Sequence, residues 1–259
     1  MSRPRPARPQ DGLAWITGAS SGIGRQLALE LVGRGWTVVA TARREAELAA
    51  LATEAQGRIM AAPADVTDAR AVAAAVHRVQ AESGRPIALA VLNAGTYVHD
   101  SAERFDLDAF TRQVRVNVDG TATALAAVMP AMIARGSGQI AIVSSVAGYR
   151  GLPRAIAYSA TKAALIAMAE SLKFDLDRAG VMVNVVNPGF VKTPLTDRND
   201  FPMPFLMPVE AAARRIADGL ARGRFEIAFP RRFAAILKLM RLLPYALYFP
   251  LVGRTTRRR

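Results

Sequence analysis

The chain has 259 residues, a formal net charge of +13, 51% apolar residues and no cysteine. This length fits one α/β domain with a single core, and so apolar a composition excludes an intrinsically disordered chain. Without cysteine there are no disulfides, thiolate nucleophiles or cysteine-ligated metals, and His77 and His99 are too few for a histidine metal site. We therefore expect no metal centre and a cytoplasmic location.

The positive charge lies at the two ends of the chain. Residues 1–10 contain three arginines and no acidic residue, and residues 231–259 contain eight lysines or arginines and no acidic residue. The centre is nearly neutral, which argues against a nucleic-acid groove across the body. Two roles remain open for the ends, contact with an anionic surface or solubility. Because residues 1–10 lack an apolar stretch, we expect a flexible basic arm there and not a signal peptide.

A glycine-rich turn joins the first predicted strand and helix. Residues 13–17 form a short apolar run, Gly18, Gly22 and Gly24 follow it, and helical apolar spacing covers residues 26–33. Glycines let the backbone approach a pyrophosphate, and the start of a helix offers free N–H groups and the positive end of a dipole. The turn therefore predicts a phosphate-binding loop, with a glycine-rich turn that binds nothing as the alternative. Its spacing differs from the G-x-G-x-x-G dinucleotide fingerprint.

The second predicted strand, residues 36–41, ends next to Arg43 and Arg44. In a dinucleotide-binding fold, an acidic residue at this distance from the glycines holds the 2′-hydroxyl of NAD. Two guanidinium groups stand there instead, and guanidinium is suited to a 2′-phosphate. The sequence therefore favours NADP(H) over NAD(H), unless the arginines only open the next helix on the surface.

Strands and helices alternate along the rest of the chain. This alternation predicts an α/β fold with a doubly wound, Rossmann-like parallel sheet, formed by one domain over residues 11–230. Asn117 places an amide within the apolar pattern of the long fourth helix. Further strands are expected at residues 59–64, 87–92, 139–144, 181–187 and 225–229, and helices at 45–54, 68–83, 107–135, 156–179 and 209–223.

A tyrosine and a lysine four residues apart predict a proton-transfer site. Tyr158 and Lys162 project from one face of the predicted helix, so the ammonium can lower the pKa of the phenol towards neutral pH. Ser145 follows the preceding strand, and the loop between them can fold its hydroxyl back beside the phenol. For the pair alone, a surface lysine stacked over a half-buried tyrosine is the alternative.

Seven markers follow one another along about residues 11–230, on the expected alternation of strands and helices. They are Thr17-Gly18-x-x-x-Gly22-x-Gly24, Asp65, Asn93-Ala94-Gly95, Asn117, Ser145, Tyr158-x-x-x-Lys162 and Pro188-Gly189 followed by Thr193. Together they resemble the short-chain dehydrogenase/reductase family in its shorter form, and the family's glycine spacing is the one found here.

The resemblance implies an NADP(H)-dependent oxidoreductase that moves a hydride between nicotinamide and a carbonyl or alcohol. By similarity, Tyr158 exchanges a proton with the substrate oxygen, Lys162 lowers the pKa of the phenol and binds the nicotinamide ribose, Ser145 holds the substrate oxygen, and Asn117 supports a proton-relay water. A non-catalytic nucleotide-sensing or scaffold protein of the same fold is the alternative. The cofactor-binding residues that the resemblance implies are Gly18, Ser20, Ser21, Gly22, Ile23, Gly24, Arg43, Asp65, Val66, Asn93, Ala94, Gly95, Tyr158, Lys162, Pro188, Gly189, Val191 and Thr193.

Two segments bear on substrate and partners. Residues 194–207 form an apolar loop, either a lid over a lipophilic carbonyl or alcohol or a contact with another subunit or the C-terminal segment.

Residues 233–252 are apolar but contain two basic residues and two prolines, which argues against a membrane span. We expect residues 231–259, an apolar segment with a basic tail, either to lie on an anionic membrane surface or to pack on the loop or a second subunit. The helices of Asn117 and Tyr158 are expected to form a homodimer or homotetramer interface.

Overall fold

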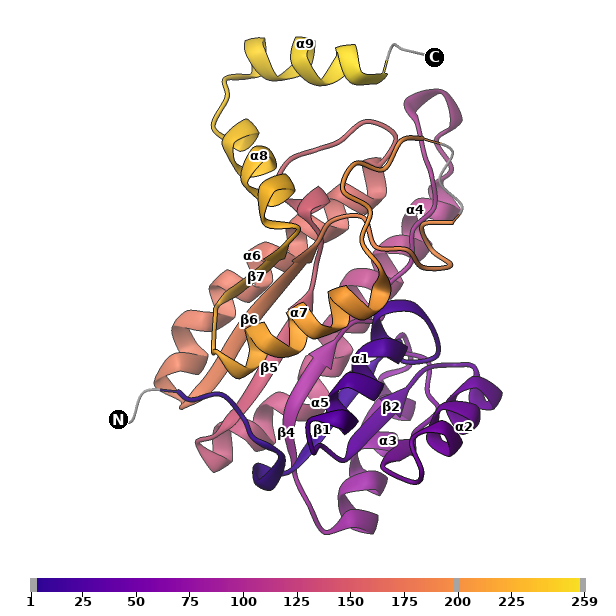
Figure 1. The fold of residues 1–259 in the computed structure, drawn as a ribbon, viewed down its shortest axis with the longest axis vertical. Helices are drawn as coiled ribbons and strands as arrows, with labels where there is room; N and C mark the ends of the chain where they lie inside the picture. Colours follow the sequence, from indigo (N-terminus) through magenta and orange to yellow (C-terminus); the bar gives the residue numbers. More distant parts are fainter. Residues whose placement is uncertain (1–3, 198–200, 257–259) are drawn as a thin grey trace.

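The described residues, 4–197 and 201–256 of a computed structural model, form one sheet of seven parallel strands with helices on both faces (Figure 1). The strand order is β3-β2-β1-β4-β5-β6-β7, so the chain reverses direction across the sheet between β1 and β4. Ligands of open α/β sheets bind at such a reversal, outside the carboxyl ends of the strands. The strands are β1 (Leu13–Thr17), β2 (Val38–Thr41), β3 (Ile59–Ala61), β4 (Ile87–Leu92), β5 (Gly138–Val143), β6 (Val181–Pro188) and β7 (Glu226–Phe229).

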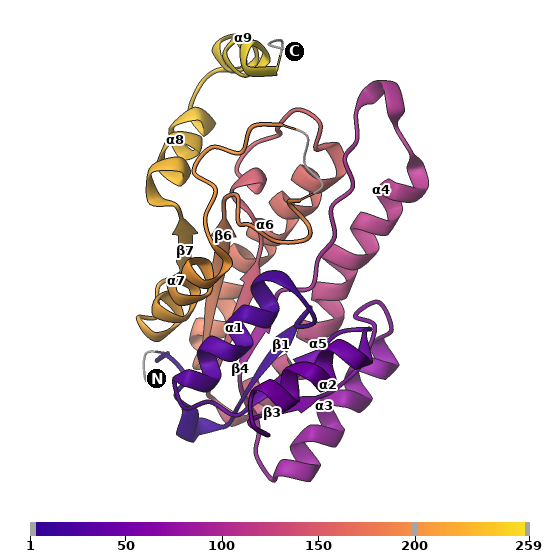
Figure 2. The same cartoon turned by 45° about the vertical axis from the view of Figure 1, so that its right-hand side comes forward.

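Helices cover both faces of the sheet (Figure 2). One face packs against α1, α2 and α7, and the other packs against α3, α5 and α6, with α4 leading into α5. This arrangement confirms the predicted doubly wound fold. The helices are α1 (Gly22–Gly33), α2 (Glu45–Glu54), α3 (Ala69–Ser83), α4 (Leu107–Val114), α5 (Gly120–Arg135), α6 (Ile156–Arg178) and α7 (Val209–Ala221).

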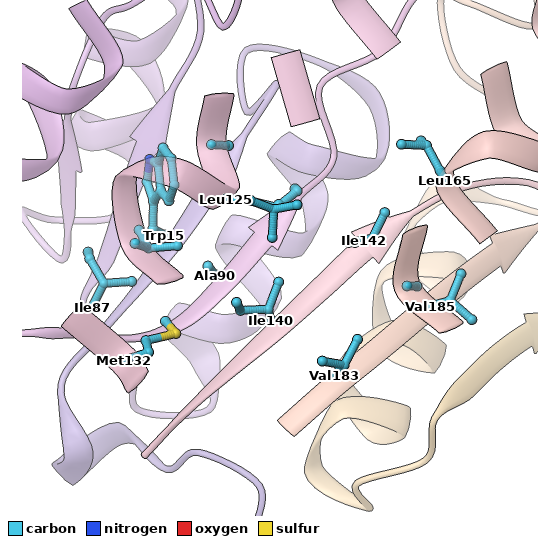
Figure 3. Close-up of a cluster of buried hydrophobic side chains, with 14 of the residues drawn as sticks. Trp15, Ile87, Ala90, Leu125, Met132, Ile140, Ile142, Leu165, Val183 and Val185 are labelled. Atoms are coloured by element: carbon cyan, nitrogen blue, oxygen red, sulfur yellow. The ribbon is translucent and has the colours of Figure 1, made fainter. Parts of the chain in front are cut away.

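Side chains alternate between the two faces along each strand. In β1, Leu13 and Trp15 belong to the cluster under α3, α5 and α6, whereas Ala14 and Ile16 belong to the cluster under α1, α2 and α7. Figure 3 shows Trp15 in the first cluster, with Leu125 of α5. Because both faces are covered, β1 and β4 are buried over their whole length, which explains their continuous apolar runs.

Three strands are shorter than the sequence predicts: β7 by one residue, since it begins at Glu226, and β2 and β3 by two or more. β2 begins at Val38 and not at residue 36, because Trp36 donates its N–H to Leu31 O (3.0 Å) in the turn that follows α1. β3 ends at Ala61 and not at residue 64, although Ala62 N and Ala64 N still donate to Ala40 O (2.9 Å) and Ala42 O (3.1 Å) beyond its end.

The helix predicted over residues 107–135 contains a π-helical turn, Arg115–Asp119, between α4 and α5. Asn117 lies in this turn and is fully buried. Such turns are frequent at functional sites. Length and composition alone would allow the whole run to cross a membrane. However, Leu125, Val128 and Met132 of α5 pack against the sheet, so it is a core helix.

Both ends of the described chain contact the domain. Near the N-terminus, Ala7 N donates to Gln139 Oε1 (2.9 Å). At the C-terminus, α8 (Arg231–Arg241) follows β7, and α9 (Tyr245–Thr256) lies across the end of the molecule towards which the strands point (Figure 1). The two C-terminal helices therefore share the carboxyl end of the sheet with the loops after β4, β5 and β6.

Candidate active site

The turn between β1 and α1 borders a groove of about 520 Å³. Gly18 and Gly22 have φ angles of +69° and +54°, a left-handed conformation that favours glycine. A Cβ on Gly18 would lie 2.8 Å from Ala94 Cα, so the turn lies directly against the chain that leaves β4. Because α1 begins at Gly22, its free N–H groups and the positive end of its dipole lie at this groove.

Thr17 and Asn93 hold the glycine turn in place. Thr17 Oγ1 accepts the N–H groups of Asn93 and Ala94 (both 3.0 Å), and Asn93 Nδ2 donates to Thr17 O (3.0 Å) and Gly18 O (3.3 Å). Gly24 lies beneath the turn, where a Cβ would be 2.4 Å from Gly18 O. Gly24 therefore allows close packing of α1 and does not line the groove.

Arg43 and Arg44 both line the groove, beside Asp65. The side chain of Arg43 is 75% exposed, and its Nη1 lies 3.8 Å from Asp65 Oδ2. Arg44 donates to Ser20 Oγ (3.0 Å) in the glycine turn and to Glu47 Oε1 (3.0 Å). Arg44 is thus held against the turn, and Arg43 is the more accessible cation.

Ser145, Tyr158 and Lys162 meet at the carboxyl end of β5. Lys162 Nζ lies 5.6 Å from the centre of the Tyr158 ring and donates to Val143 O (3.0 Å). Ser145 Oγ accepts the N–H of Ala147 (3.1 Å), donates to Pro188 O (3.3 Å), and interacts with the Tyr158 phenol. The predicted convergence of a phenol, an ammonium and a hydroxyl is therefore present in the structure.

Asn117 is fixed beside this group by the loop after β4. Its Oδ1 accepts Thr96 N (2.7 Å), and its Nδ2 donates to Thr96 O (3.0 Å) and Thr161 Oγ1 (3.0 Å). A Cβ on Gly95 would lie 3.3 Å from Asn117 Oδ1 and 3.5 Å from Lys162 Nζ. Glycine at position 95 therefore keeps the approach between the amide and the ammonium open.

Burial changes the acidity of both catalytic candidates. Burial raises the pKa of the Tyr158 phenol, and the interaction with Ser145 lowers it by less. Burial lowers the pKa of Lys162 from 10.5 to about 8. The lysine therefore exchanges its proton at a pH close to neutral, and its charged form favours the phenolate of Tyr158.

A second, smaller cavity of about 150 Å³ opens beside Tyr158 and Ser145. The ring of Tyr97 meets the Tyr158 ring edge-on at 5.0 Å. Leu195 lines both this cavity and the groove, so the two adjoin at that residue. The cavity is lined by Tyr97, Ser145, Val146, Ala147, Leu152, Pro153, Ala155, Tyr158, Gly189, Phe190, Leu195, Thr196, Phe201 and Phe233.

Most of the predicted cofactor residues line the groove, but some do not. Gly189 lines the smaller cavity, Pro188 lies beneath it as the acceptor for Ser145, and Val191 is buried and paired with Met207. The groove contains the predicted Gly18, Ser20, Ser21, Gly22, Ile23, Arg43, Asp65, Val66, Asn93, Ala94, Gly95 and Thr193. It also contains Arg44, which the sequence analysis names beside Arg43, and Pro194 and Leu195 of the predicted apolar loop. The sequence prediction missed Ala42, Ala64, Thr96, Arg112 and Val116.

Position along the strands could have identified several of the missed residues. Ala42 follows β2, Ala64 lies shortly after β3 and Thr96 after β4, all at the carboxyl edge where a ligand binds. Arg112 comes from α4, and no pattern in the sequence marks it.

The groove suits a nicotinamide dinucleotide. Positive-φ glycines and a helix start border it for a pyrophosphate, two arginines line it, and the groove adjoins the cavity that contains Tyr158. When bound, such a cofactor supplies the hydride. The chain supplies a proton donor or acceptor beside it. The fold and the site together define a nucleotide-dependent oxidoreductase.

Known proteins with related sequences or structures agree with this class. The family described as short chain dehydrogenase matches residues 13–201. An uncharacterized oxidoreductase of Myxococcus xanthus is 42% identical over 238 residues, 91% of this chain and 94% of the relative. Two solved structures are similar: ElxO with NADP bound (TM-score 0.75, 26% identity, 84% of this chain and 97% of that one) and 3-ketoacyl-(acyl-carrier-protein) reductase of Brucella melitensis complexed with NADH (TM-score 0.77, 27% identity, 85% and 98%).

The chain belongs to the short-chain dehydrogenase family. It is an NAD(P)-dependent dehydrogenase or reductase.

The buried Lys162 predicts a pH-dependent stability difference. Its pKa is lowered to about 8 in the folded protein, so between about pH 8 and 10.5 the unfolded chain binds more protons and stability rises with pH. Below pH 8 Lys162 is charged in the folded protein, so the full free-energy cost of burying its charge is present. We expect Lys162→Met to raise the free energy of unfolding at pH 7, by on the order of 3 kcal/mol, and to lose this advantage towards pH 10.5. Urea unfolding at both pH values measures it.

Lys192→Met is the control. Lys192 is exposed, so this change removes one positive charge from the surface and none from the interior. An equal gain in stability for Lys162→Met at pH 7 and pH 10.5 would contradict this explanation.

Proposed function

We propose that the protein is an NADP(H)-dependent oxidoreductase that acts on a lipophilic carbonyl or secondary alcohol. The observation that carries the proposal is the meeting of Tyr158, Lys162 and Ser145 beside both the groove and an apolar cavity.

Four side chains divide the proton chemistry. In reduction, Tyr158 gives its phenolic proton to the carbonyl oxygen as the carbon receives a hydride, and in oxidation it takes the hydroxyl proton. Ser145 donates a hydrogen bond to the same oxygen and stabilises its developing charge. Lys162 favours the phenolate and binds the nicotinamide ribose. Asn117 supports a water that returns protons to Lys162.

The lining of the smaller cavity supports a lipophilic substrate. None of its described lining residues is charged, and three are phenylalanines, Phe190, Phe201 and Phe233. Phe190 and Phe233 stack with ring centres 5.8 Å apart, and Phe190 meets Phe201 at 6.0 Å. A cavity of this kind gains free energy by taking an apolar group out of water.

The arginines support NADP(H). Arg43 is accessible at the groove, and no carboxylate follows β2 until Glu45, the first residue of α2. Guanidinium binds phosphate well, whereas the ribose 2′-hydroxyl of NAD is usually held by a carboxylate at this place.

Location and assembly belong to the same proposal. The protein is cytoplasmic, its C-terminal helices contact an anionic membrane surface, and it forms a homodimer or homotetramer. Ile133 of α5 and Phe174 of α6, 44% and 76% exposed, support an interface through these two helices. Light scattering during size-exclusion chromatography measures the assembly.

Removing the phenolic hydroxyl tests the enzymatic function. Tyr158→Phe is expected to lower kcat by about a thousandfold or more while NADPH still binds, because only the proton donor is lost. Oxidation of NADPH with ketones of increasing chain length is the measurement, and kcat/KM of the unaltered protein should rise with chain length. Wild-type protein that binds NADPH but turns over no carbonyl would favour a non-catalytic nucleotide-binding protein.

Reversing the charge at position 43 tests the cofactor. Arg43→Asp is expected to weaken NADPH binding by about tenfold or more and to weaken NADH binding far less, because only NADPH carries the 2′-phosphate. Fluorescence titration with both nucleotides measures this. Arg58→Asp, which changes an exposed arginine outside the groove lining, is the matched control. An unchanged preference in Arg43→Asp would contradict the assignment.

A further inference from the structure

The outward surface of α8 and α9 is apolar. The inward side chains Ala234 and Leu237 of α8 and Tyr248 and Val252 of α9 are buried. Seven large apolar side chains on the other sides of these helices are 47–79% exposed, which is unusual for a surface that meets only water. We call them the C-terminal apolar surface: Ile236, Leu239, Leu242, Tyr245, Leu247, Phe249 and Leu251.

The positive charge around the C-terminal apolar surface favours an anionic partner. Arg231, Arg232, Arg241 and Arg254 are exposed on the same two helices, and residues 231–259 contain no acidic residue. Two copies meeting here would bring like charges together, which is unfavourable. An anionic lipid bilayer satisfies both features, since acyl chains accept the apolar side chains and headgroups accept the arginines.

The same helices are joined to the substrate cavity. Arg150 donates to Met240 O and Leu243 O (both 2.7 Å), and its guanidinium lies 3.8 Å from the centre of the Tyr248 ring. Tyr248 Oη donates to Gly151 O (2.6 Å). The next two residues along this loop, Leu152 and Pro153, line the cavity, as does Phe233 of α8.

We propose that the C-terminal apolar surface docks the protein on an anionic bilayer and brings the substrate cavity to the lipid. A lipophilic substrate then enters from the membrane and not from water. The docking stands on the exposed surface and its charge, whereas the route of the substrate rests on the proposed function.

Co-sedimentation of the full chain with vesicles tests the docking. Wild-type protein should bind vesicles that contain phosphatidylglycerol and leave pure phosphatidylcholine vesicles unbound. Leu242→Glu/Phe249→Glu should bind at least about tenfold more weakly, because carboxylates enter the contact. Ala73→Glu/Ala74→Glu, which adds two carboxylates to exposed residues of α3, should bind as wild type does.

Three results would overturn the docking. The first is equal vesicle binding by Leu242→Glu/Phe249→Glu and wild type, and the second is equal binding of wild type to neutral and anionic vesicles. The third is a change in oligomeric state without vesicles that Leu242→Glu/Phe249→Glu alone causes, which would assign the surface to a second copy. Turnover of a water-soluble ketone, measured without vesicles, separates this from failure of the proposed function, since the docking variant should keep that activity.

A second inference concerns Asp100, on the loop after β4. Its carboxylate is buried, with Oδ1 accepting Ile156 N (2.6 Å) and Oδ2 accepting Ala157 N (2.8 Å). These are the first two residues of α6, and Tyr158 is the third. The N-cap residue Ala155 provides no side-chain acceptor. The geometry points to Asp100 as a positioning residue that sets the height and direction of the Tyr158 phenol.

Asp106→Ala is a matched control for Asp100→Ala. Asp106 Oδ1 accepts Asp108 N (2.9 Å) and Ala109 N (3.1 Å) at the start of α4, so both variants lose a carboxylate cap. Asp100→Ala should lower kcat by about tenfold to a hundredfold with the KM for NADPH unchanged, since only the phenol is displaced. Asp100→Asn, which keeps one acceptor, should recover part of the loss. Equal kcat for Asp100→Ala and Asp106→Ala would overturn the role.

Discussion

The buried ammonium of Lys162 is the constraint on which the active site depends. Burial disfavours its charge, so the surrounding chain must compensate, and Val143 O at the end of β5 does so directly. The backbone around it is held equally firmly: Ser144 Oγ donates to Lys162 O (2.7 Å), and a Cβ on Gly148 would lie 2.7 Å from the same carbonyl. The end of β5 and the helix α6 therefore form one rigid unit, and Ser145 and Tyr158 take their positions from it.

The sequence was sufficient for the fold because both faces of the sheet are covered. Full burial makes each strand an apolar run, and the polar residues that interrupt those runs at the carboxyl ends, such as Asn93 and Ser145, are the site itself. Strand limits were less predictable, since the turn at Trp36 is a local effect that apolar periodicity does not show. The sequence does not predict the π-helical turn at Asn117. Its only sign there is a polar amide within the apolar pattern of the helix.

Long-range contacts explain what the sequence did not reveal about the site. Arg112 reaches the groove from α4, and Asp100 reaches α6 across 56 and 57 positions of the chain, so no local pattern marks either residue. Gly24 is a different case. Its place in a family marker predicts contact with a cofactor, which stays a prediction, and its contacts with Gly18 and Asn93 give it a place in the packing of α1.

The match to the family covers residues 13–201, but part of the substrate cavity comes from beyond it. Phe233 of α8 lines the cavity. Glu226 of β7 links α8 to the loop between Ser145 and Tyr158, because its carboxylate accepts the Tyr149 hydroxyl and the Asn187 amide (3.0 Å) and pairs with Lys238. Burial opposes ionisation of Glu226, yet these partners hold its pKa below the usual value, so the link stays charged. A change in the C-terminal helices therefore reaches the loop between Ser145 and Tyr158 without altering either of these two residues. The lining of the smaller cavity can thus change through α8 while Tyr158 and Lys162 keep their positions.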